Sequence, residues 1–242
     1  MASLFDKEDI QHHISKQFDQ ELVDIHSRIL AMGGLVEEQV AAGVKSLIDA
    51  DAELAERVVA DDVKINSLEV SIDEECTQIL ARRQPTARDL RLVMAVIKTI
   101  TDLERIGDEA KRIAFHAMDL SKQFPKRNQF SDLEHLASHV SDMLSDALDA
   151  FARMDVEQAL RVVQDDKVAN KEYESILRQQ ITYMMEDPRS IHVCLDIMWS
   201  ARSLERIGDR ACNICEYVIY YVMGKDIRHI SLEEAQREIK GG

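Results

Sequence analysis

The chain has 242 residues, of which 45% are hydrophobic, 5% aromatic and 31% charged, with only 8 glycines and 3 prolines. This mixture is typical of amphipathic helices rather than of a disordered chain. The net charge of −15 opposes phosphate backbones and anionic lipid headgroups, so we expect no binding to nucleic acid and contact with a membrane only through partner proteins. No stretch approaches the ~20 apolar residues of a membrane-spanning helix, and residues 1–16 lack the apolar core of a secretory signal. We therefore expect an all-α, cytoplasmic protein.

The first half of the chain contains three apolar segments that are poor in glycine and proline. They span residues 18–49, 51–83 and 86–120. Gly33 and Gly34 are a weak point in the first segment. In the third, apolar residues recur in alternating steps of four and three from Leu92 to Leu120, which predicts one stripe that faces a neighbouring helix.

The second half contains three further segments of the same kind. They span residues 132–152, 155–186 and 189–223. Pro85 and Pro188 each lie where a helix can begin, because proline has a suitable φ for the first turn and needs no hydrogen-bond donor there. Thr86 followed by Asp89 predicts a capping pair at one of these starts.

The two halves are copies of one another. LERIGD occurs at residues 103–108 and again at 204–209, and ADDVKIN at 60–66 is similar to QDDKVAN at 164–170. Long helices with short connections favour antiparallel neighbours. We therefore predict a tandem repeat of two antiparallel three-helix bundles. Their bounds are 18–122 and 131–224, with a link near 123–129 and tails at 1–17 and 225–242.

Each LERIGD hexapeptide contains two acidic residues four positions apart. Glu104 and Asp108 therefore lie on one helix face beside the apolar stripe, and Glu205 and Asp209 repeat that placement. Like charges at this spacing cost an isolated helix roughly 0.2 to 0.5 kcal/mol. Something should offset that repulsion.

Arginine is the simplest compensation for these carboxylates. Asp108 has Arg112 four residues later, and Glu205 has Arg202 three residues earlier. A solvated acidic face with arginine neighbours explains most single pairs of this kind.

Three features of the repeat point beyond a solvated face. The pair recurs at the same place in both copies, and each copy places a glycine inside the helix, Gly107 and Gly208, despite the low helix propensity of glycine. Each copy also has a second polar pair on the preceding segment. These pairs are Asp62 with Asn66, and Asp166 with Asn170. If the segments are antiparallel, the two pairs of each copy lie at comparable heights and can converge.

Clustered oxygen ligands suit hard or borderline cations such as Mg²⁺, Mn²⁺ or iron, and they tolerate Zn²⁺. The pattern therefore predicts surface metal sites. A ferritin-type di-iron centre is excluded, because that centre needs Glu-x-x-His and the sequence has none. Asp132 with His135 is the nearest approach. We expect His12, His13 and His192 at the surface.

Four cysteines are too few for a disulfide framework. Cys212 and Cys215 form a C-x-x-C, but inside a helical pattern and not at the strand-to-helix turn of redox motifs. We expect Cys76 and Cys194 to stay reduced in a cytosolic chain. We expect Cys212 and Cys215 to be small packing residues, with a redox or zinc role as the alternative.

LERIGD-x-A on a long helix, present twice, with D-D-x-x-x-N upstream in both copies, resembles the PhoU family over residues 18–223. The resemblance implies six helices in two similar bundles, with E/D-x-x-x-D motifs that bind metal ions at the surface. By position, those motifs fall on Glu104 with Asp108 and on Glu205 with Asp209. Their partners fall on the two polar pairs of the preceding segments.

This chain departs from the family pattern at the partner motifs. Asn66 and Asn170 occupy positions where aspartate is common in metal-loaded members, which removes a charge from each site. Asn213 follows Asp209 by four and offers a carbonyl oxygen, whereas Arg112 in the matching place brings a positive charge. We therefore expect stronger metal binding in the second copy.

The resemblance also implies the function. Members of the family couple the ATP-binding subunit of the phosphate ABC transporter to a sensor histidine kinase, and they repress the phosphate-starvation regulon as negative regulators when phosphate is plentiful. They are commonly homodimers. The cluster of Tyr217, Tyr220 and Tyr221 fits either such an interface or packing within the bundle.

Two other functions compete with this one. Clustered metals can activate water, so a metal-dependent hydrolase or phosphatase is one alternative, although the sequence shows no nucleophile or positioned base. A structural helical scaffold, in which the carboxylates only provide solubility, is the other. We expect a regulatory protein and not an enzyme.

Overall fold

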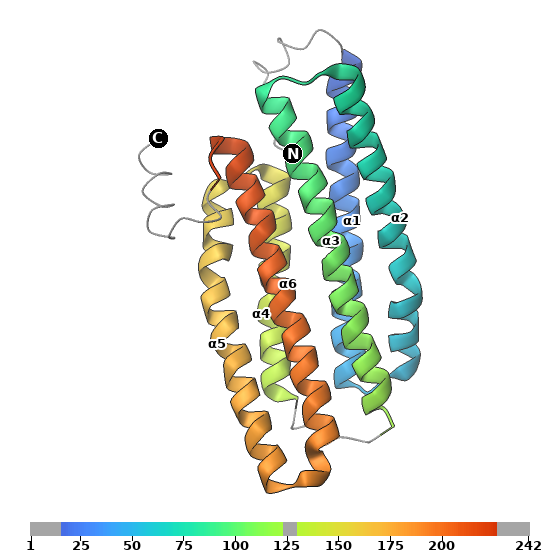
Figure 1. The fold of residues 1–242 in the computed structure, drawn as a ribbon, viewed down its shortest axis with the longest axis vertical. Helices are drawn as coiled ribbons and strands as arrows, with labels where there is room; N and C mark the ends of the chain where they lie inside the picture. The colour runs from blue at the N-terminus through green and yellow to red at the C-terminus, as the bar shows by residue number, and fades with distance from the viewer. Residues whose placement is uncertain (1–15, 123–129, 227–242) are drawn as a thin grey trace.

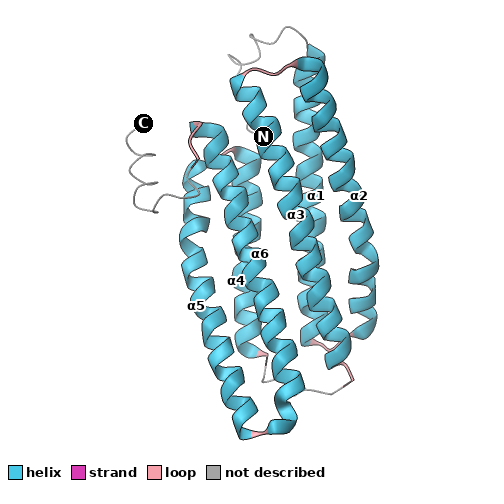
Figure 2. Ribbon diagram, viewed as in Figure 1, coloured by secondary structure: helices cyan, strands magenta, loops and turns pink. Residues whose placement is uncertain are grey.

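The predicted all-α fold of two antiparallel three-helix bundles is confirmed (Figures 1 and 2). The structure is a computed structural model that describes residues 16–122 and 130–226. The predicted link at 123–129, residues 1–15 and 227–242 of the predicted tails, and with them His12 and His13, lie outside the described residues. The elements are α1 (Lys16–Ile48), α2 (Ala52–Arg83), α3 (Ala87–Leu120), α4 (Ser131–Arg153), α5 (Val156–Glu186), η3 (Pro188–Ser190) and α6 (Ile191–Met223).

The first turn of each bundle is built in the same way. Ala50 and Met154 both adopt the left-handed conformation with φ 51°, and each is followed by an aspartate that caps the next helix. The Asp51 and Asp155 carboxylates accept the backbone N–H three residues later, at 2.9 and 3.0 Å. These caps satisfy donors that the first turn of a helix leaves unpaired. The hairpin turns thus follow the internal repeat.

Three local expectations need correction. Helix α1 continues through Gly33 and Gly34 without a break, because tertiary packing outweighs the low helix propensity of glycine. A β-carbon at Gly33 would overlap the Leu148 side chain, so this glycine lets α4 approach. At the start of α3, Thr86 makes no side-chain bond to the backbone; its hydroxyl donates to Asp89 at 3.4 Å. Pro188 opens the short 3₁₀ helix η3 and not α6 itself.

The predicted stripe of α3 forms part of a buried core. Every member of the stripe is at most 1% exposed; they are Leu92, Val96, Thr99, Leu103, Ile106, Ala110, Ile113, Ala117 and Leu120. Each buried Leu or Ile contributes roughly 1.5 to 3 kcal/mol. The core residues of both bundles form one continuous cluster. The proposed division at residues 122 and 131 therefore separates two bundles that share a core, and the bounds of the two domains stay a prediction.

Helices α3 and α6 form the main contact between the bundles, and they lie side by side at the front of Figure 1. They run antiparallel, so Asp102 faces Arg210 while Glu109 faces Ser203. These two pairs exchange under the 101-residue offset of the repeat. The pseudo-twofold axis that relates the bundles therefore passes between the two LERIGD hexapeptides. None of the described helices is long and apolar enough to span a membrane.

Candidate functional site

The two hexapeptides combine packing residues with acidic residues that lie beside them. Leu103 and Ile106 of α3, like Leu204 and Ile207 of α6, are at most 1% exposed. The acidic residues of the motifs face the helix that precedes each one, α2 in the first repeat and α5 in the second. Local helix geometry therefore produces the predicted placement beside the core.

In the first repeat, the site centres on the buried carboxylate of Asp62 in α2. One oxygen, Oδ2, accepts a hydrogen bond from the Lys111 ammonium of α3 at 2.8 Å and another from the Asn66 amide at 3.2 Å. The other, Oδ1, accepts the Gln39 amide of α1 at 3.4 Å. Lys111 also lies 3.8 Å from Asp108 Oδ1. A lysine thus sits between the two predicted motifs.

The remaining predicted residue of this copy, Glu104, is half-buried on the same face. Burial raises the pKa of Glu104, and the nearby charges of Asp108, Glu69 and Asp62 raise it further. Glu69 of α2, which the sequence-based prediction missed, also has a raised pKa, chiefly because of burial. The four predicted side chains of the first repeat do share one region, as expected. Their charges are partly balanced by Lys111.

In the second repeat, Asp166 of α5 lies against α6. Its Oδ2 accepts the Asn170 amide at 2.7 Å. Its Oδ1 accepts no hydrogen bond within residues 16–122 and 130–226, and it lies 3.7 Å from where a β-carbon on Gly208 would be. Asp166 therefore faces the hexapeptide directly, and one of its oxygens is available.

Glu205 is mostly buried and uses only one of its two oxygens. Arg202 donates to Oε1 at 2.7 Å, whereas Oε2 is buried without a hydrogen-bond partner. Burial raises the pKa of Glu205, and Asp209 and Asp166 raise it further. Burial and then the Asp209 charge raise the pKa of Asp166. Asp209 itself is exposed. The Asp209 charge thus disfavours the charged forms of Glu205 and Asp166, whereas burial raises the pKa of Asp209 itself and the charges of Arg202, Arg210 and Arg206 lower it.

A histidine stands next to the second cluster. His139 Nδ1 of α4 lies 3.1 Å from Glu172 Oε2 of α5, and His139 is close enough to lower the pKa of Asp166. The sequence-based prediction missed both residues because they come from different helices without a short motif. No group of three or more His, Cys, Asp or Glu side chains among the described residues already has metal-holding geometry. A bound ion would therefore need these side chains to move.

The predicted arginine compensation is half right. Arg202 does pair with Glu205, but Arg112 pairs with Glu109 at 2.6 Å and not with Asp108. Lys111, one residue earlier, is the cation that reaches the acidic motif. Glu104, Asp108 and Lys111 are spaced at four and three residues, so helical periodicity alone would have placed all three on one face.

The expectation for Asn213 is wrong. Its amide donates to Asp102 of α3 at 3.4 Å, so it points to the interface between the bundles. Asp102 is 2% exposed, and its carboxylate also accepts hydrogen bonds from Tyr217 Oη at 2.8 Å and from Arg210 at 3.2 Å. Because a buried carboxylate needs such donors, this network holds α3 and α6 in register.

Two more buried carboxylates cross the same interface. Glu109 of α3 accepts Ser203 at 2.8 Å and Arg206 at 3.2 Å from α6. Asp196 of α6 lies 3.1 Å from His116 Nδ1 of α3. The contact between the bundles therefore includes buried carboxylates with polar partners, which the apolar periodicity of the sequence did not indicate.

The two predicted glycines have ordinary packing surroundings. A β-carbon at Gly107 would lie 3.2 Å from an Ile65 methyl and 3.3 Å from Gln39 Oε1, and at Gly208 the nearest atoms would be 3.7 Å away. Neither glycine faces another backbone. Gly43 of α1 does: a β-carbon there would lie 2.9 Å from the Ala110 carbonyl oxygen.

The cysteines fit the packing interpretation, whereas the tyrosines pack between the bundles and not within one bundle. All four cysteines are free thiols. Burial raises the pKa of Cys212 and Cys215, which disfavours the thiolate that redox chemistry or zinc binding needs. Tyr221 is buried, and Lys98 of α3 lies 5.4 Å from the ring centroids of both Tyr217 and Tyr220. The tyrosine cluster thus packs against the other bundle.

The predicted surface histidines are exposed where the structure describes them. His192 lies in the first turn of α6, and Asp132 and His135 are both exposed on α4. Asp132 and His135, the two residues most similar to a ferritin-type motif, are therefore both exposed to solvent.

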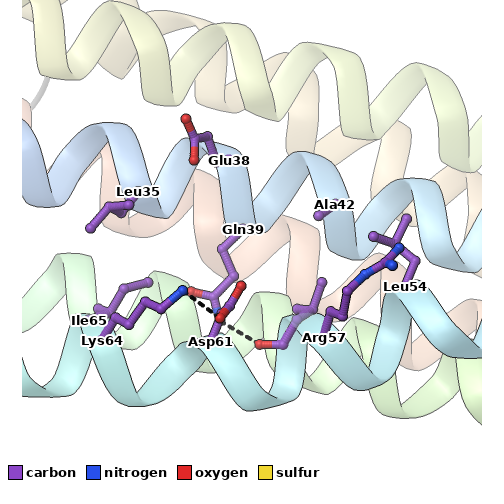
Figure 3. A pocket seen from close by; sticks show the side chains of 10 residues that line it. Leu35, Glu38, Gln39, Ala42, Leu54, Arg57, Asp61, Lys64 and Ile65 are labelled. Carbon is purple, nitrogen blue, oxygen red and sulfur yellow. Dashed lines mark hydrogen bonds and ion pairs between the residues drawn. The ribbon is translucent and has the colours of Figure 1, made fainter.

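An open groove of about 250 Å³ lies between α1 and α2 (Figure 3). Apolar side chains such as Leu35 and Leu54 line it, and Lys64 pairs with Asp61 at its edge at 2.7 Å. Gln39 lies in the groove and joins it to the first-repeat site, because its amide donates to the Val58 carbonyl and to Asp62. The groove therefore borders the site but contributes no carboxylate of the predicted set.

The comparisons with known proteins agree with the two-copy architecture. The model of the PhoU domain family matches residues 29–117 and 133–218. The "Phosphate-specific transport system accessory protein PhoU homolog" of Pseudomonas aeruginosa is 51% identical over 237 residues, which cover 98% of each chain. The PhoU of Escherichia coli with the same accessory-protein description is 47% identical over 238 residues, again covering 98% of each.

Solved structures show the same similarity. The crystal structure of PhoU from Pseudomonas aeruginosa has a TM-score of 0.84 and 52% identity, covering 86% of this chain and all of that one. The crystal structure of "the phosphate transport system regulatory protein PhoU" from Streptococcus pneumoniae has a TM-score of 0.80 and 30% identity, covering 86% of this chain and 98% of that one.

Proposed function

The chain belongs to the PhoU family, and from that premise we propose that it is an adaptor that reports phosphate sufficiency. An accessory role in regulating phosphate transport follows from the family. The finer proposal is that the chain contacts the ATP-binding subunit of the phosphate ABC transporter and a sensor histidine kinase, in the cytoplasm. Through these partners it represses the phosphate-starvation regulon. This proposal is supported by the 51% and 47% identity to accessory proteins of the phosphate-specific transport system, in each case over 98% of both chains.

The architecture is suited to a protein adaptor. Within residues 16–122 and 130–226, six α-helices of 23 to 34 residues form two bundles with a shared core and offer long, rigid surfaces. Rigid surfaces bind partners without a large loss of conformational entropy. The net charge of −15 opposes direct action on DNA, which leaves protein contacts as the route to repression.

We propose a metal ion at the carboxylates of the second repeat as part of this function. Asp166, Glu205 and Asp209 would hold it, with Asn170 beside them. The supporting observation is Glu205 Oε2, a buried oxygen with no partner. Such an atom costs free energy unless a donor or a cation satisfies it. Mg²⁺, Mn²⁺, iron or Zn²⁺ would each suit these oxygen ligands and cancel their mutual repulsion.

We also propose that the chain acts as a homodimer and not as an enzyme. Sedimentation of the purified protein tests the dimer. Turnover of phosphoesters by the metal-loaded protein, lost on Glu205→Gln, would contradict the regulatory assignment and favour a hydrolase.

Affinity capture of the intact chain from cells grown in high and low phosphate tests the adaptor proposal. We expect the transporter ATP-binding subunit and the kinase to be recovered together with the chain, with a ratio that depends on phosphate. Metal content is measured on the same recovered protein. Absence of both partners under either condition would contradict the proposal.

A further inference from the structure

Equivalent aspartates in the two repeats have different hydrogen-bond partners. Asp62 and Asp166 occupy matching places on α2 and α5, and each is followed four residues later by an asparagine that donates to it. Asp62 is 2% exposed and receives two further donors, Gln39 and Lys111. Asp166 receives neither. The difference lies in the residues that the repeat places around each aspartate.

Both extra donors have been replaced in the second repeat. The position that matches Gln39 is Met143, which lies 3.7 Å from the β-carbon position of Gly208, just as Gln39 lies 3.3 Å from that of Gly107. The position that matches Lys111, one turn after the hexapeptide, is Cys212. The Cys212 thiol is directed to the Val162 carbonyl of α5 at 3.9 Å. Two neutral sulfur side chains thus stand where the first repeat has an amide and an ammonium.

Lys111 has the position of a bridging cation. Its Nζ is 2.8 Å from Asp62 of α2 and 3.8 Å from Asp108 of its own helix. A lysine side chain carries a positive charge at neutral pH, so this position holds a cation. A tethered ammonium group in such a place both balances the carboxylates and repels a metal ion.

Arg202 does not bridge two carboxylates of the second repeat in this way. Its guanidinium bonds one oxygen of Glu205 and lies 5.7 Å from the centroid of the Tyr173 ring, and the Arg202 side chain is 46% exposed. It leaves two carboxylate oxygens, Glu205 Oε2 and Asp166 Oδ1, without donors among the described residues. At the first-repeat site the buried oxygens without a partner are the neutral amide oxygens of Gln39 and Asn66. The charges of Arg202, Arg206 and Arg210 act on Asp209, but none of these arginines bridges two carboxylates of the cluster as Lys111 does in the first repeat.

We propose that Lys111 occupies in the first repeat the place that a divalent cation takes in the second, so the chain has one metal site and one lysine-filled counterpart. This inference rests on the metal binding proposed above. The replacement of Gln39 and Lys111 by Met143 and Cys212 is what opens the second site. Metal binding is thereby confined to the bundle of α4, α5 and α6.

The test uses the intact chain, stripped with a chelator and titrated with Mn²⁺ and, separately, Zn²⁺ by calorimetry, with metal content measured after gel filtration. For the parent chain we expect binding that Asp166→Asn abolishes and Asp62→Asn leaves unchanged. Lys111→Met should add a second class of site, which Asp62→Asn then removes. Cys212→Lys should weaken binding by roughly tenfold or more.

Arg112→Met is the matched control, because it removes the same charge from the adjacent position but pairs with Glu109 and not with the site. It should add no metal site. Circular dichroism and thermal unfolding in chelator check that each variant folds. In chelator, Cys212→Lys should also raise the midpoint of thermal unfolding, since it adds a tethered cation to the three carboxylates.

The outcomes separate this inference from the metal proposal. Two sites in the parent chain, one of them lost on Asp62→Asn, would overturn the inference and leave the metal proposal standing. One metal site in the parent chain, with no second site in Lys111→Met, would also overturn the inference and leave the metal proposal standing. No binding by any variant, at any metal, would overturn both.

Discussion

Gly43 of α1 faces the backbone of Ala110 of α3 so closely that a β-carbon on residue 43 would lie 2.9 Å from the Ala110 carbonyl oxygen. Backbone cannot rotate away as a side chain can, so Gly43→Ala should push the two helices apart. Overpacking of this kind costs about 1 to 3 kcal/mol. Urea unfolding measures the loss.

Gly208→Ala is the matched comparison. Its added methyl group would meet its nearest neighbours at 3.7 Å, which is ordinary contact, and alanine has the better helix propensity. We therefore expect a gain of up to ~1 kcal/mol. Equal losses in the two variants would show that the close approach of α1 to α3 does not depend on Gly43.

Tyr217→Phe should destabilise the interface between the bundles. The Tyr217 hydroxyl donates to the buried carboxylate of Asp102 at 2.8 Å, and hydrogen bonds to charged groups contribute roughly 1.5 to 3 kcal/mol. Because Arg210 and Asn213 remain as donors, we expect a loss near the lower end. Tyr220→Phe is the control, since Tyr220 has the same Lys98 contact without a bond to Asp102. Its urea midpoint should stay within error of the parent value.

His26 should make stability depend on pH. It is 4% exposed, stacks on Phe151 with ring centroids 5.5 Å apart, and burial lowers its pKa from the ordinary value of 6.5. Below pH 6.5 the unfolded chain takes up a proton that the folded chain resists. The contribution of His26 is therefore fully present above pH 6.5 and is lost as pH falls towards its lowered folded pKa.

The measurement is the free energy of unfolding between pH 7.5 and pH 5 for the parent chain and for His26→Phe, which preserves the aromatic stack. The variant should lose less stability over this range. His135→Phe, at an exposed position, should follow the parent curve. A His26→Phe curve parallel to that of the parent would contradict the assignment.

Asp209→Asn should act in opposite directions with and without metal. In chelator, removal of the charge relieves the repulsion with Glu205, worth roughly 0.2 to 0.5 kcal/mol for like charges four residues apart. With excess Mn²⁺, the parent chain should gain thermal stability and the variant should gain less. Asp108→Asn, at the equivalent place beside Lys111, should leave the Mn²⁺ effect unchanged. An unchanged Mn²⁺ response in Asp209→Asn would exclude Asp209 as a ligand.

The fold was open to prediction because its signals are local and repeated. The alternating steps from Leu92 to Leu120 specify a buried stripe, and every member of that stripe is buried. Asp51 and Asp155 bound their helices as caps. The weak point predicted at Gly33 and Gly34 was wrong because Gly33 packs against Leu148 of α4, a contact that no short window of sequence contains.

The site was predictable only in part. Periodicity placed Glu104 with Asp108, and Glu205 with Asp209, beside the core, and antiparallel helices brought Asp62 and Asp166 to them. The partners of Arg112 and Asn213 were assigned from spacing of four within one helix. Both instead point across to other side chains, Glu109 and Asp102, because the side-chain angle around the helix decides the partner.

His139, Glu172 and the donors of Asp102 come from helices distant in sequence. Their contacts depend on how α4 and α5, and α3 and α6, pack together. A single sequence does not contain that information. The contrast between Lys111 and Cys212 was visible in the repeat, but its meaning required the position of the Lys111 ammonium.

The central claim is that this chain represses the phosphate-starvation response and uses the second-repeat carboxylates to do so. The most direct measurement is the activity of a phosphate-starvation promoter in high phosphate, in cells whose own copy of the gene is replaced by the parent chain, by Asp166→Asn with Glu205→Gln, or by Asp62→Asn. Protein amounts and helicity are matched among the three. We predict repression by the parent chain and by Asp62→Asn, and derepression by the double variant. Full repression by the double variant would contradict the claim and favour a helical scaffold whose carboxylates only provide solubility.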